Sequence, residues 1–225
     1  MPSTLPLFPL NTVLVPGLVM PLHIFEPRYR HMVTTLLALP DEDDREFGII
    51  AVRPGHDLTV DAMAALYPVG CATVIRQYEV LDDGRYDIVT TGSRRFRVLS
   101  VDTSLPLLSA QVEFLDDDEL AHDDRAALRA ARAFRTYRAV LGDQVVDSTE
   151  PDEDDGIPDD PTVLSYLITA AMVLTVEERQ SLLAALTTAE RLVLAHELLH
   201  RESGVISALS ALPALEPLGP PPSAN

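Results

Sequence analysis

Two histidines and a glutamate near the C-terminal end of the chain have the spacing found in zinc-dependent hydrolases. His196, Glu197 and His200 spell H-E-x-x-H, which on a helix places two imidazoles on one face with a carboxylate beside them as general base. A catalytic zinc ion also needs a third protein ligand. One common continuation of the motif has Gly at position 203 and His at position 206, where this chain has Ser203 and Ile206.

The helix that would carry this motif also has an ordinary apolar stripe. Leucine and alanine recur on one face of it at Leu192, Ala195, Leu198 and Leu199. This pattern predicts a bundle helix in which His196 and His200 flank the core side. Glu202 is too close to be a usual third ligand, and Glu216 lies in a proline-rich tail. The sequence leaves two interpretations: structural histidines with no metal bound, and, as the alternative, a zinc-dependent hydrolase centred on residues 196–200.

The other basic and nucleophilic residues exclude several chemistries. All 17 basic residues are arginines, so a P-loop lysine, a Ser–Lys dyad and a Schiff-base lysine are absent. The single cysteine, Cys71, excludes an internal disulfide and a multi-cysteine metal site. No serine lies in a G-x-S-x-G elbow, and there is no G-x-G-x-x-G loop. We therefore expect a protein that is not an enzyme and that uses no cofactor.

The charge balance points away from nucleic acid and membranes as partners. The 225 residues contain 35 acidic and 17 basic side chains, for a formal net charge of −18. Such a field repels phosphate backbones and anionic lipid surfaces, because binding to them relies on lysine and arginine contacts. No apolar run approaches the roughly 18–20 residues that span a bilayer, and no basic n-region precedes an apolar core of the signal-peptide type. These features predict a cytoplasmic protein.

Short apolar runs broken by proline, glycine and acidic clusters predict strands in the first half of the chain. The runs lie at 47–52, 69–80, 85–90, 96–101 and 107–114. The turn signal at 82–84 joins the second and third runs as a hairpin. A helix opens at Pro27 and continues with apolar residues at helical spacing to Leu37. Many short strands with one inserted helix predict a small β-barrel over residues 1–115.

After residue 115 the apolar period becomes helical and predicts a bundle over 116–212. One helix is expected at 122–141, stopped by Gly142, and another at 162–174, capped by Asp160 and Pro161. Capping-box sequences predict two further helix starts, at Thr175–Glu178 and Thr187–Glu190. The acidic stretch 143–161 predicts a solvated loop, and the proline-rich 213–225 predicts a disordered tail.

Residues near the N-terminus carry a specific family resemblance. Residues 5–17 (LPLFPLNTVLVPG) and 21–29 (PLHIFEPRY) closely resemble the N-terminal substrate-binding domain of the Lon ATP-dependent protease family. Later segments agree in the same order, at 67–75, 92–98, 177–183 and 190–192. The resemblance covers about residues 4–205, nearly the whole chain.

The resemblance implies an α+β fold, a PUA-like β-barrel followed by a helical bundle. It also implies recognition of polypeptides without cleavage, because Lon enzymes continue into ATPase and peptidase modules that this chain is expected to lack. The expected partners are unfolded or exposed hydrophobic polypeptide segments, together with a protease or chaperone. The expected role is that of an adaptor or client-binding protein in protein quality control, with the oligomeric state left open.

Four residues of the N-terminal segment are candidate binding residues. The aromatic side chains of Phe8, Phe25 and Tyr29 either fill the core between barrel and helix or line an apolar groove for clients. Arg28, together with the arginine cluster at 94–97, would frame such a groove. The two interpretations differ in whether these side chains are buried.

Overall fold

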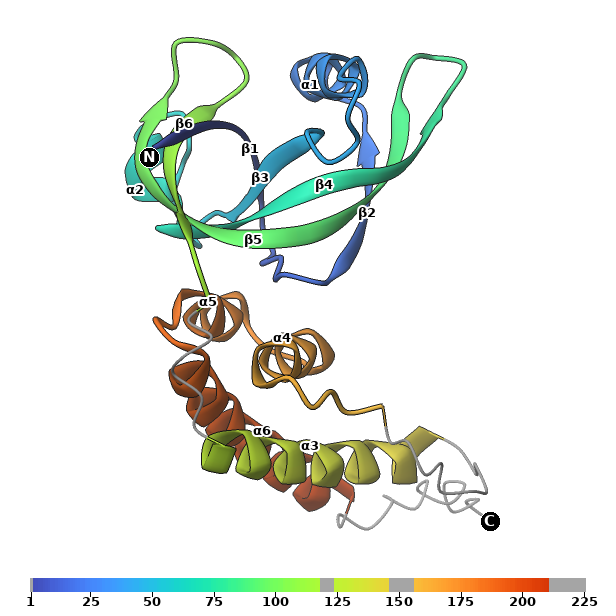
Figure 1. The fold of residues 1–225 in the computed structure, drawn as a ribbon, viewed down its shortest axis with the longest axis vertical. Coiled ribbons are helices and arrows are strands. Elements are labelled where there is room, and N and C mark those ends of the chain that lie inside the picture. Colours follow the sequence, from blue (N-terminus) through green and yellow to red (C-terminus); the bar gives the residue numbers. More distant parts are fainter. Residues whose placement is uncertain (1, 118–123, 146–155, 211–225) are drawn as a thin grey trace, which may run out of the picture.

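The computed structural model describes residues 2–117, 124–145 and 156–210, which form an α+β fold with a β-barrel beside a group of helices (Figure 1). Within these ranges one mixed sheet contains the strands β1 (Ser3–Leu10), β2 (Val19–Ile24), β3 (Glu46–Ala51), β4 (Val69–Val80), β5 (Tyr86–Asp102) and β6 (Ser109–Leu115). The sheet order is β2-β5-β4-β3-β1-β6, and β5 also pairs with β6. Five strands therefore close into a ring, while β2 extends β5 outside it.

The strands β4 and β5 form the predicted hairpin, and the turn between them depends on a glycine. Gly84 has a φ of +77°, a conformation that glycine adopts without the steric cost of a Cβ atom. The prediction of separate strands at 85–90 and 96–101 is wrong, because both runs belong to β5. Register shifts along the β4–β5 and β5–β6 pairs bend this long strand, so that it pairs with β2 in its first half and β6 in its second.

The proline-rich N-terminal segment forms strands as well as bends. The strand β1 changes partner along its length, pairing antiparallel with β6 over Ser3–Pro6 and parallel with β3 over Leu7–Leu10. Proline lacks the N–H that a ladder requires, and Pro6 lies where the first pairing ends. Pro6 therefore coincides with the change of partner along β1 that helps to close the barrel.

The helix α1 (Pro27–Leu37) lies across the end of the barrel that faces away from the other helices (Figure 1). It begins as predicted, with Pro27 at its first position. Its buried side chains pack on the barrel core and are Tyr29, Met32, Val33 and Leu36. A second short helix, α2 (Ala62–Ala65), contacts β5.

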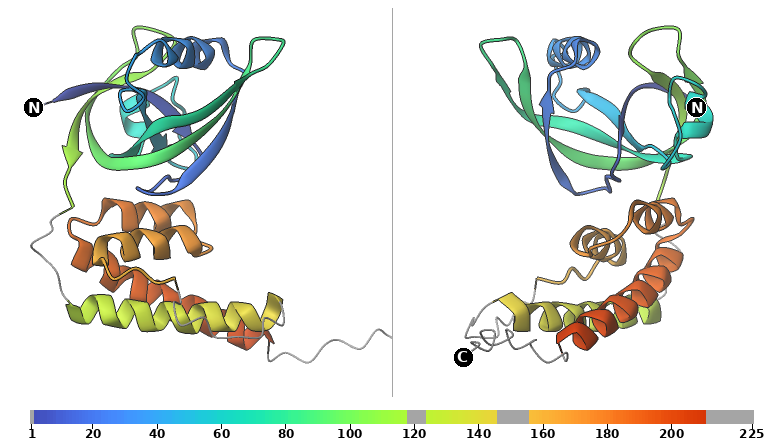
Figure 2. Two further views of the ribbon diagram at one scale, coloured as in Figure 1. Left: turned by 45° about the vertical axis from the view of Figure 1, so that its right-hand side comes forward. Right: turned by 180° about the vertical axis from the view of Figure 1, so that it is seen from behind.

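The remaining helices form two layers below the barrel (Figure 2). They are α3 (Asp124–Val145), α4 (Pro161–Ala171), α5 (Val176–Ala184) and α6 (Thr188–Ser210). The helices α4 and α5 lie directly against the barrel, and α3 and α6 pack along each other beyond them (Figure 2). The core between barrel and helices includes Val13, Val69, Tyr166 and Leu183.

The helix starts predicted at Pro161, Thr175 and Thr187 are confirmed, the start predicted at 122 lies outside the described residues, and the stop predicted at Gly142 is wrong. Both hydrogen bonds of the capping box join Thr175 and Glu178. At the start of α6, Thr187 accepts from the Glu190 N–H, but the Glu190 carboxylate accepts from the Leu186 N–H instead of that of Thr187. Gly142 does not end α3, which continues to Val145; glycine inside a helix costs only about 1 kcal/mol.

Parts of the predicted organisation lie outside the described residues. These parts are 146–155 of the acidic stretch and the tail at 213–225. Among the helices that the structure describes, none is both long and apolar enough to cross a membrane.

Candidate functional site

An apolar groove lies between α1 and the loop that joins β5 to β6 (residues 103–108), at the end of the barrel opposite the bundle (Figure 1). We call it the α1 groove. Its volume is about 410 Å³, and it is lined by Pro6, Arg28, His31, Met32, Thr35, Leu36, Leu105, Pro106 and Leu107. Six of these side chains are apolar, and Leu105 is 68% exposed at the rim. The groove therefore offers apolar surface to solvent.

Two of the predicted binding residues lie beneath the α1 groove. Phe8 and Tyr29 are both buried, with ring centroids 4.2 Å apart, and Phe8 also lies 6.1 Å from the ring of Phe47. Burial raises the pKa of the Tyr29 hydroxyl. These aromatic rings fix α1 to the barrel core and thereby support one wall of the groove.

Arg28 lines the α1 groove and connects its two walls. Its Nε donates to the Glu26 carboxylate at 2.9 Å, and its Nη1 makes a long hydrogen bond of 3.4 Å to the carbonyl of Pro106 in the loop. The guanidinium also lies 4.7 Å from the centroid of the Tyr29 ring. Because Glu26 pairs with this arginine, the groove has little net charge.

Phe25, the fourth predicted residue, is exposed but lies outside the groove. Its ring is 60% exposed and stacks on His23 at a centroid distance of 6.2 Å. Arg85 donates to Nε2 of His23 at 3.1 Å, which leaves Nδ1 to donate to Asp87 at 2.6 Å. Of the four predicted residues, only Arg28 therefore lines the groove, while Phe8 and Tyr29 fill the core and Phe25 lies elsewhere.

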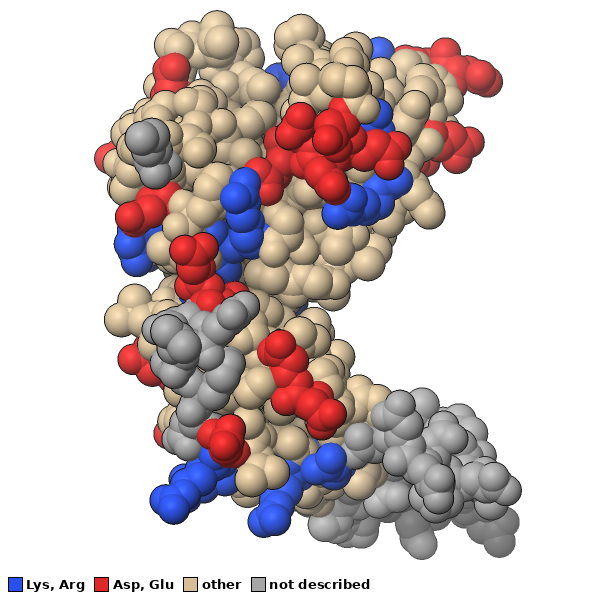
Figure 3. Space-filling view, in the orientation of Figure 1, with Lys and Arg blue, Asp and Glu red and all other residues tan. Residues whose placement is uncertain are grey.

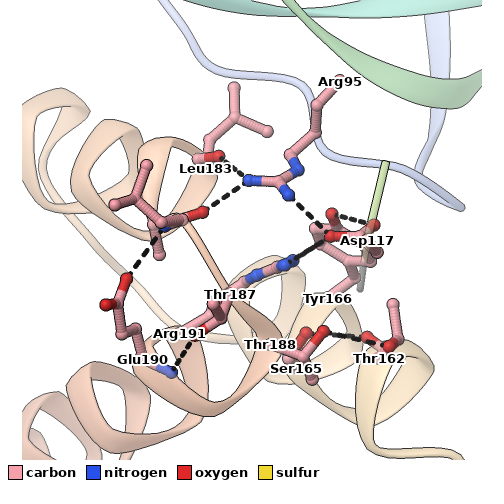
Figure 4. A network of polar contacts seen from close by, with 12 residues as sticks. Arg95, Asp117, Thr162, Ser165, Tyr166, Leu183, Thr187, Thr188, Glu190 and Arg191 are labelled. Carbon is pink, nitrogen blue, oxygen red and sulfur yellow. Dashed lines mark hydrogen bonds and ion pairs between the residues drawn. The ribbon is translucent and has the colours of Figure 1, made fainter. Parts of the chain in front are cut away.

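A buried polar network joins the barrel to the helical bundle (Figure 4). Asp117, just after β6, accepts through Oδ1 from Arg95 of β5 at 2.8 Å and from Arg191 of α6 at 2.6 Å. Its Oδ2 accepts from the Tyr166 hydroxyl of α4 at 2.6 Å. One carboxylate thus connects three secondary structure elements from both halves of the molecule.

Both arginines of this junction are removed from water. Arg95 and Arg191 are 2% and 0% exposed, and a buried charge is tolerated only when it is paired and hydrogen-bonded. Arg95 gains two further acceptors, the carbonyls of Leu183 and Ala185 at 3.1 and 2.6 Å. Burial lowers the pKa of Arg191. The network therefore fixes the bundle on the barrel.

The predicted arginine cluster at 94–97 is divided between the buried junction and the surface. Arg95 points into the junction, whereas Arg94 and Arg97 are exposed and pair with Glu46 and Glu113. The end of α5 covers Arg95, which donates to the carbonyls of Leu183 and Ala185, and this contact explains the division. These arginines do not frame the α1 groove.

The H-E-x-x-H residues lie on α6 as the sequence predicts, but the part of the chain that the structure describes adds no third ligand. Nε2 of His196 and Nε2 of His200 are 3.1 Å apart, and Glu197 is exposed. Burial, His200 and Arg129 together lower the pKa of His196. Over residues 2–117, 124–145 and 156–210, no group of three histidine, cysteine or acidic side chains is placed to hold a metal ion.

A comparison with protein families tests the family resemblance of the N-terminal segment. The model of the ATP-dependent protease La (LON) substrate-binding domain matches residues 4–201. The chain belongs to this family. The Lon protease of Anaeromyxobacter dehalogenans is 27% identical over 209 residues, and Lon protease 2 of Myxococcus xanthus is equally similar. Each alignment covers 91% of this chain and 24% of the relative, so the chain spans about a quarter of the length of these Lon proteases.

Solved Lon domains have the same fold. A Lon N-terminal domain protein from Xanthomonas campestris superposes with a TM-score of 0.63 at 24% identity, over 88% of this chain and 98% of that one. The N-terminal domain of the Mycobacterium avium complex Lon protease gives a TM-score of 0.62 at 19% identity, over 90% and 98% of the two chains. The barrel followed by helices is therefore the architecture of a Lon substrate-binding domain.

Asp117 is the junction residue that the sequence analysis missed. It stands in the acidic run at 116–118, and such runs are usually solvated. Its contacts come from residues 22 to 74 positions away in the chain. Nothing in the local sequence indicates that this carboxylate faces two buried arginines.

Proposed function

We propose that this Lon-domain chain is a non-catalytic binding module that holds exposed apolar segments of other polypeptides in the α1 groove. The groove itself is the observation that supports this function most strongly. It combines apolar walls, an exposed leucine and a neutralised arginine on the surface. The family match supports it as well, because the matched domain is described as substrate-binding.

The chemistry of the groove suits apolar side chains on an extended chain. An extended segment points alternate side chains to one side, and seating one leucine or phenylalanine fully in apolar surroundings contributes about 1.5–3 kcal/mol. A volume of about 410 Å³ lies within the usual range of ligand sites, roughly 300–1,000 Å³. Binding of this kind requires apolar residues but no defined sequence.

We also propose that the chain acts in the cytoplasm as an adaptor that presents such segments to a protease or chaperone. The absence of lysine supports a role without catalysis, since both a P-loop and a Ser–Lys dyad need that residue. In the Lon proteases that it resembles, the matching region makes up about a quarter of the chain.

A peptide titration tests the proposed site. The probe is a rhodamine-labelled 12-residue peptide with a central Leu-Phe-Leu between glycines and serines. The control peptide is identical except that Asn-Ser-Asn replaces Leu-Phe-Leu. We expect fluorescence anisotropy to show binding of the apolar peptide alone. Leu105→Glu should weaken it about tenfold, since a charge at the rim must lose water when an apolar segment binds.

The matched control places the same charge on another exposed apolar residue. Val173 is 79% exposed in the connection between α4 and α5, so Val173→Glu should leave the affinity for the apolar peptide within twofold of the original. Equal binding of the two peptides, or equal weakening by both variants, would contradict the proposal.

A further inference from the structure

The helix α3 concentrates positive charge in a strongly acidic chain. It carries five arginines and no acidic residue from position 125 to position 142, the arginines being Arg125, Arg129, Arg132, Arg135 and Arg138. All five are exposed. Spacings of four and three residues place the first three on one face of the helix. Figure 3 shows arginine side chains gathered along the lower edge of the molecule, over α3.

Two arginines of this face lack an acidic partner in the described structure. Within residues 2–117, 124–145 and 156–210, neither Arg129 nor Arg132 forms an ion pair, whereas Arg28, Arg94 and Arg97 each pair with a carboxylate. Like charges one turn apart destabilise a helix by a few tenths of a kcal/mol. The chain therefore keeps an arrangement that is unfavourable for the isolated helix, although it contains 35 acidic residues.

Apolar and imidazole side chains extend this face. Leu128, beside Arg129, is exposed. Across the packed pair of helices, Arg129 lies close enough to His196 of α6 to contribute to lowering its pKa. Glu197 is the acidic side chain that acts on this histidine in the opposite direction. The histidines of the H-E-x-x-H sequence thus border the arginine face of α3.

We propose that the exposed face of α3 centred on Arg129 and Arg132 is a docking surface for an acidic polypeptide segment. Guanidinium groups bind carboxylates through two parallel hydrogen bonds. Alternate side chains of an extended peptide are about 6.7 Å apart, close to the roughly 5–6 Å between residues one helical turn apart. A Glu-x-Glu segment therefore matches the spacing of the two arginines.

The charge distribution favours a polypeptide over a nucleic acid as the partner. A nucleic acid is long and uniformly charged, so it would also meet the repulsive field of the rest of the chain, whose net charge is −18 even with these arginines counted. A short acidic segment covers only the arginine face. This surface is separate from the α1 groove, and its occupation does not depend on the function proposed above.

A pair of charge-matched double variants tests the docking surface. The probe is a rhodamine-labelled nine-residue peptide in which four glutamates alternate with alanines, titrated at low salt by fluorescence anisotropy. Arg129→Glu/Arg132→Glu should weaken its binding about tenfold. Arg76→Glu/Arg97→Glu changes the net charge equally on the barrel surface, where both arginines are exposed, and should change the affinity less than twofold.

Three other outcomes would overturn the proposal. The first is equal weakening by both double variants, which would make the effect one of net charge alone. The second is tighter binding of a single-stranded RNA 12-mer than of the glutamate peptide, with loss of RNA binding in the α3 variant. The third is a dimer in light scattering that the α3 variant abolishes, which would assign the face to a second copy of this chain.

Discussion

Arginine has opposite roles at the barrel–bundle junction and on the outer face of α3. At the junction, Arg95 and Arg191 are buried and share the carboxylate of Asp117. On α3, Arg129 and Arg132 are exposed and form no ion pair with any residue that the structure describes. The same side chain thus stabilises the architecture where it is paired and buried, and remains available for binding where it is not.

This difference separates variants that should unfold the protein from variants that should change only its surface. A buried charge that loses its partner keeps the full cost of desolvation, whereas an exposed charge is solvated whether or not it is paired. Stability measurements on the two regions therefore distinguish structural arginines from binding arginines.

The largest effect is expected at the junction. Asp117→Ala leaves two buried guanidiniums without their shared carboxylate and should lower the free energy of unfolding by about 3–5 kcal/mol. Urea unfolding followed by circular dichroism measures the change. Glu113→Ala removes the partner of the exposed Arg97 and should cost less than about 1 kcal/mol. Similar losses in the two variants would contradict the role given to Asp117.

A smaller loss is expected from the helix that supports the junction. The carbonyls that accept from Arg95 lie at the end of α5, and Thr175 caps the start of that helix. Thr175→Ala should cost about 1 kcal/mol in the same urea experiment. Ser181→Ala, in the exposed part of α5, removes only a bond to the carbonyl of Glu177 and serves as control. A loss in the control as large as that in Thr175→Ala would refute the capping argument.

Reversing a charge on α3 should stabilise the protein, whereas the two variants above should destabilise it. Arg132→Glu places a carboxylate three residues from both Arg129 and Arg135, and such pairs stabilise a helix by about 0.2–0.5 kcal/mol each. We expect a small rise in the melting temperature by calorimetry, with weaker binding of the glutamate peptide. A fall of several degrees would show that Arg132 has a structural role.

The smallest expected effect is on the pH dependence of the free energy of unfolding in acid. Hydrogen bonds from Arg201 and from the Thr175 N–H hold the pKa of Glu178 below its usual value of 4.5. The stabilisation from this group is therefore present above pH 4.5 and decreases as the pH falls through the lowered pKa in the folded protein. In Glu178→Gln, the free energy of unfolding should decrease less between pH 5 and about pH 3 than in the original protein. Parallel pH curves for the two proteins would exclude this contribution.

The local parts of the fold could be predicted from the sequence. The hairpin at 69–90, the start of α1 at Pro27 and the capping box at Thr175 each depend on residues close together in the chain. The resemblance of residues 5–29 to Lon domains is confirmed by the family match. These signals are turn, cap and motif sequences, which act over a few residues.

The features that depend on distant contacts could not be predicted. The continuity of β5 depends on register shifts against β4 and β6. The α1 groove depends on the loop at 103–108. The strand predicted at 107–114 includes the last two residues of this loop, whereas β6 begins at Ser109. The spacing of the α3 arginines is visible in the sequence, but it does not show that Arg129 and Arg132 form no ion pair with any described residue.

Hydrogen–deuterium exchange with the Leu-Phe-Leu peptide tests the central claim most directly. The experiment compares the free chain, the chain saturated with the Leu-Phe-Leu peptide, and the chain mixed with the Asn-Ser-Asn control peptide at the same concentration. We predict slower exchange of amides in α1 and in the loop at 103–108 with the apolar peptide alone. Unchanged exchange in both segments under saturating peptide, or slower exchange confined to other surfaces, would contradict the assignment of the α1 groove as the polypeptide-binding site.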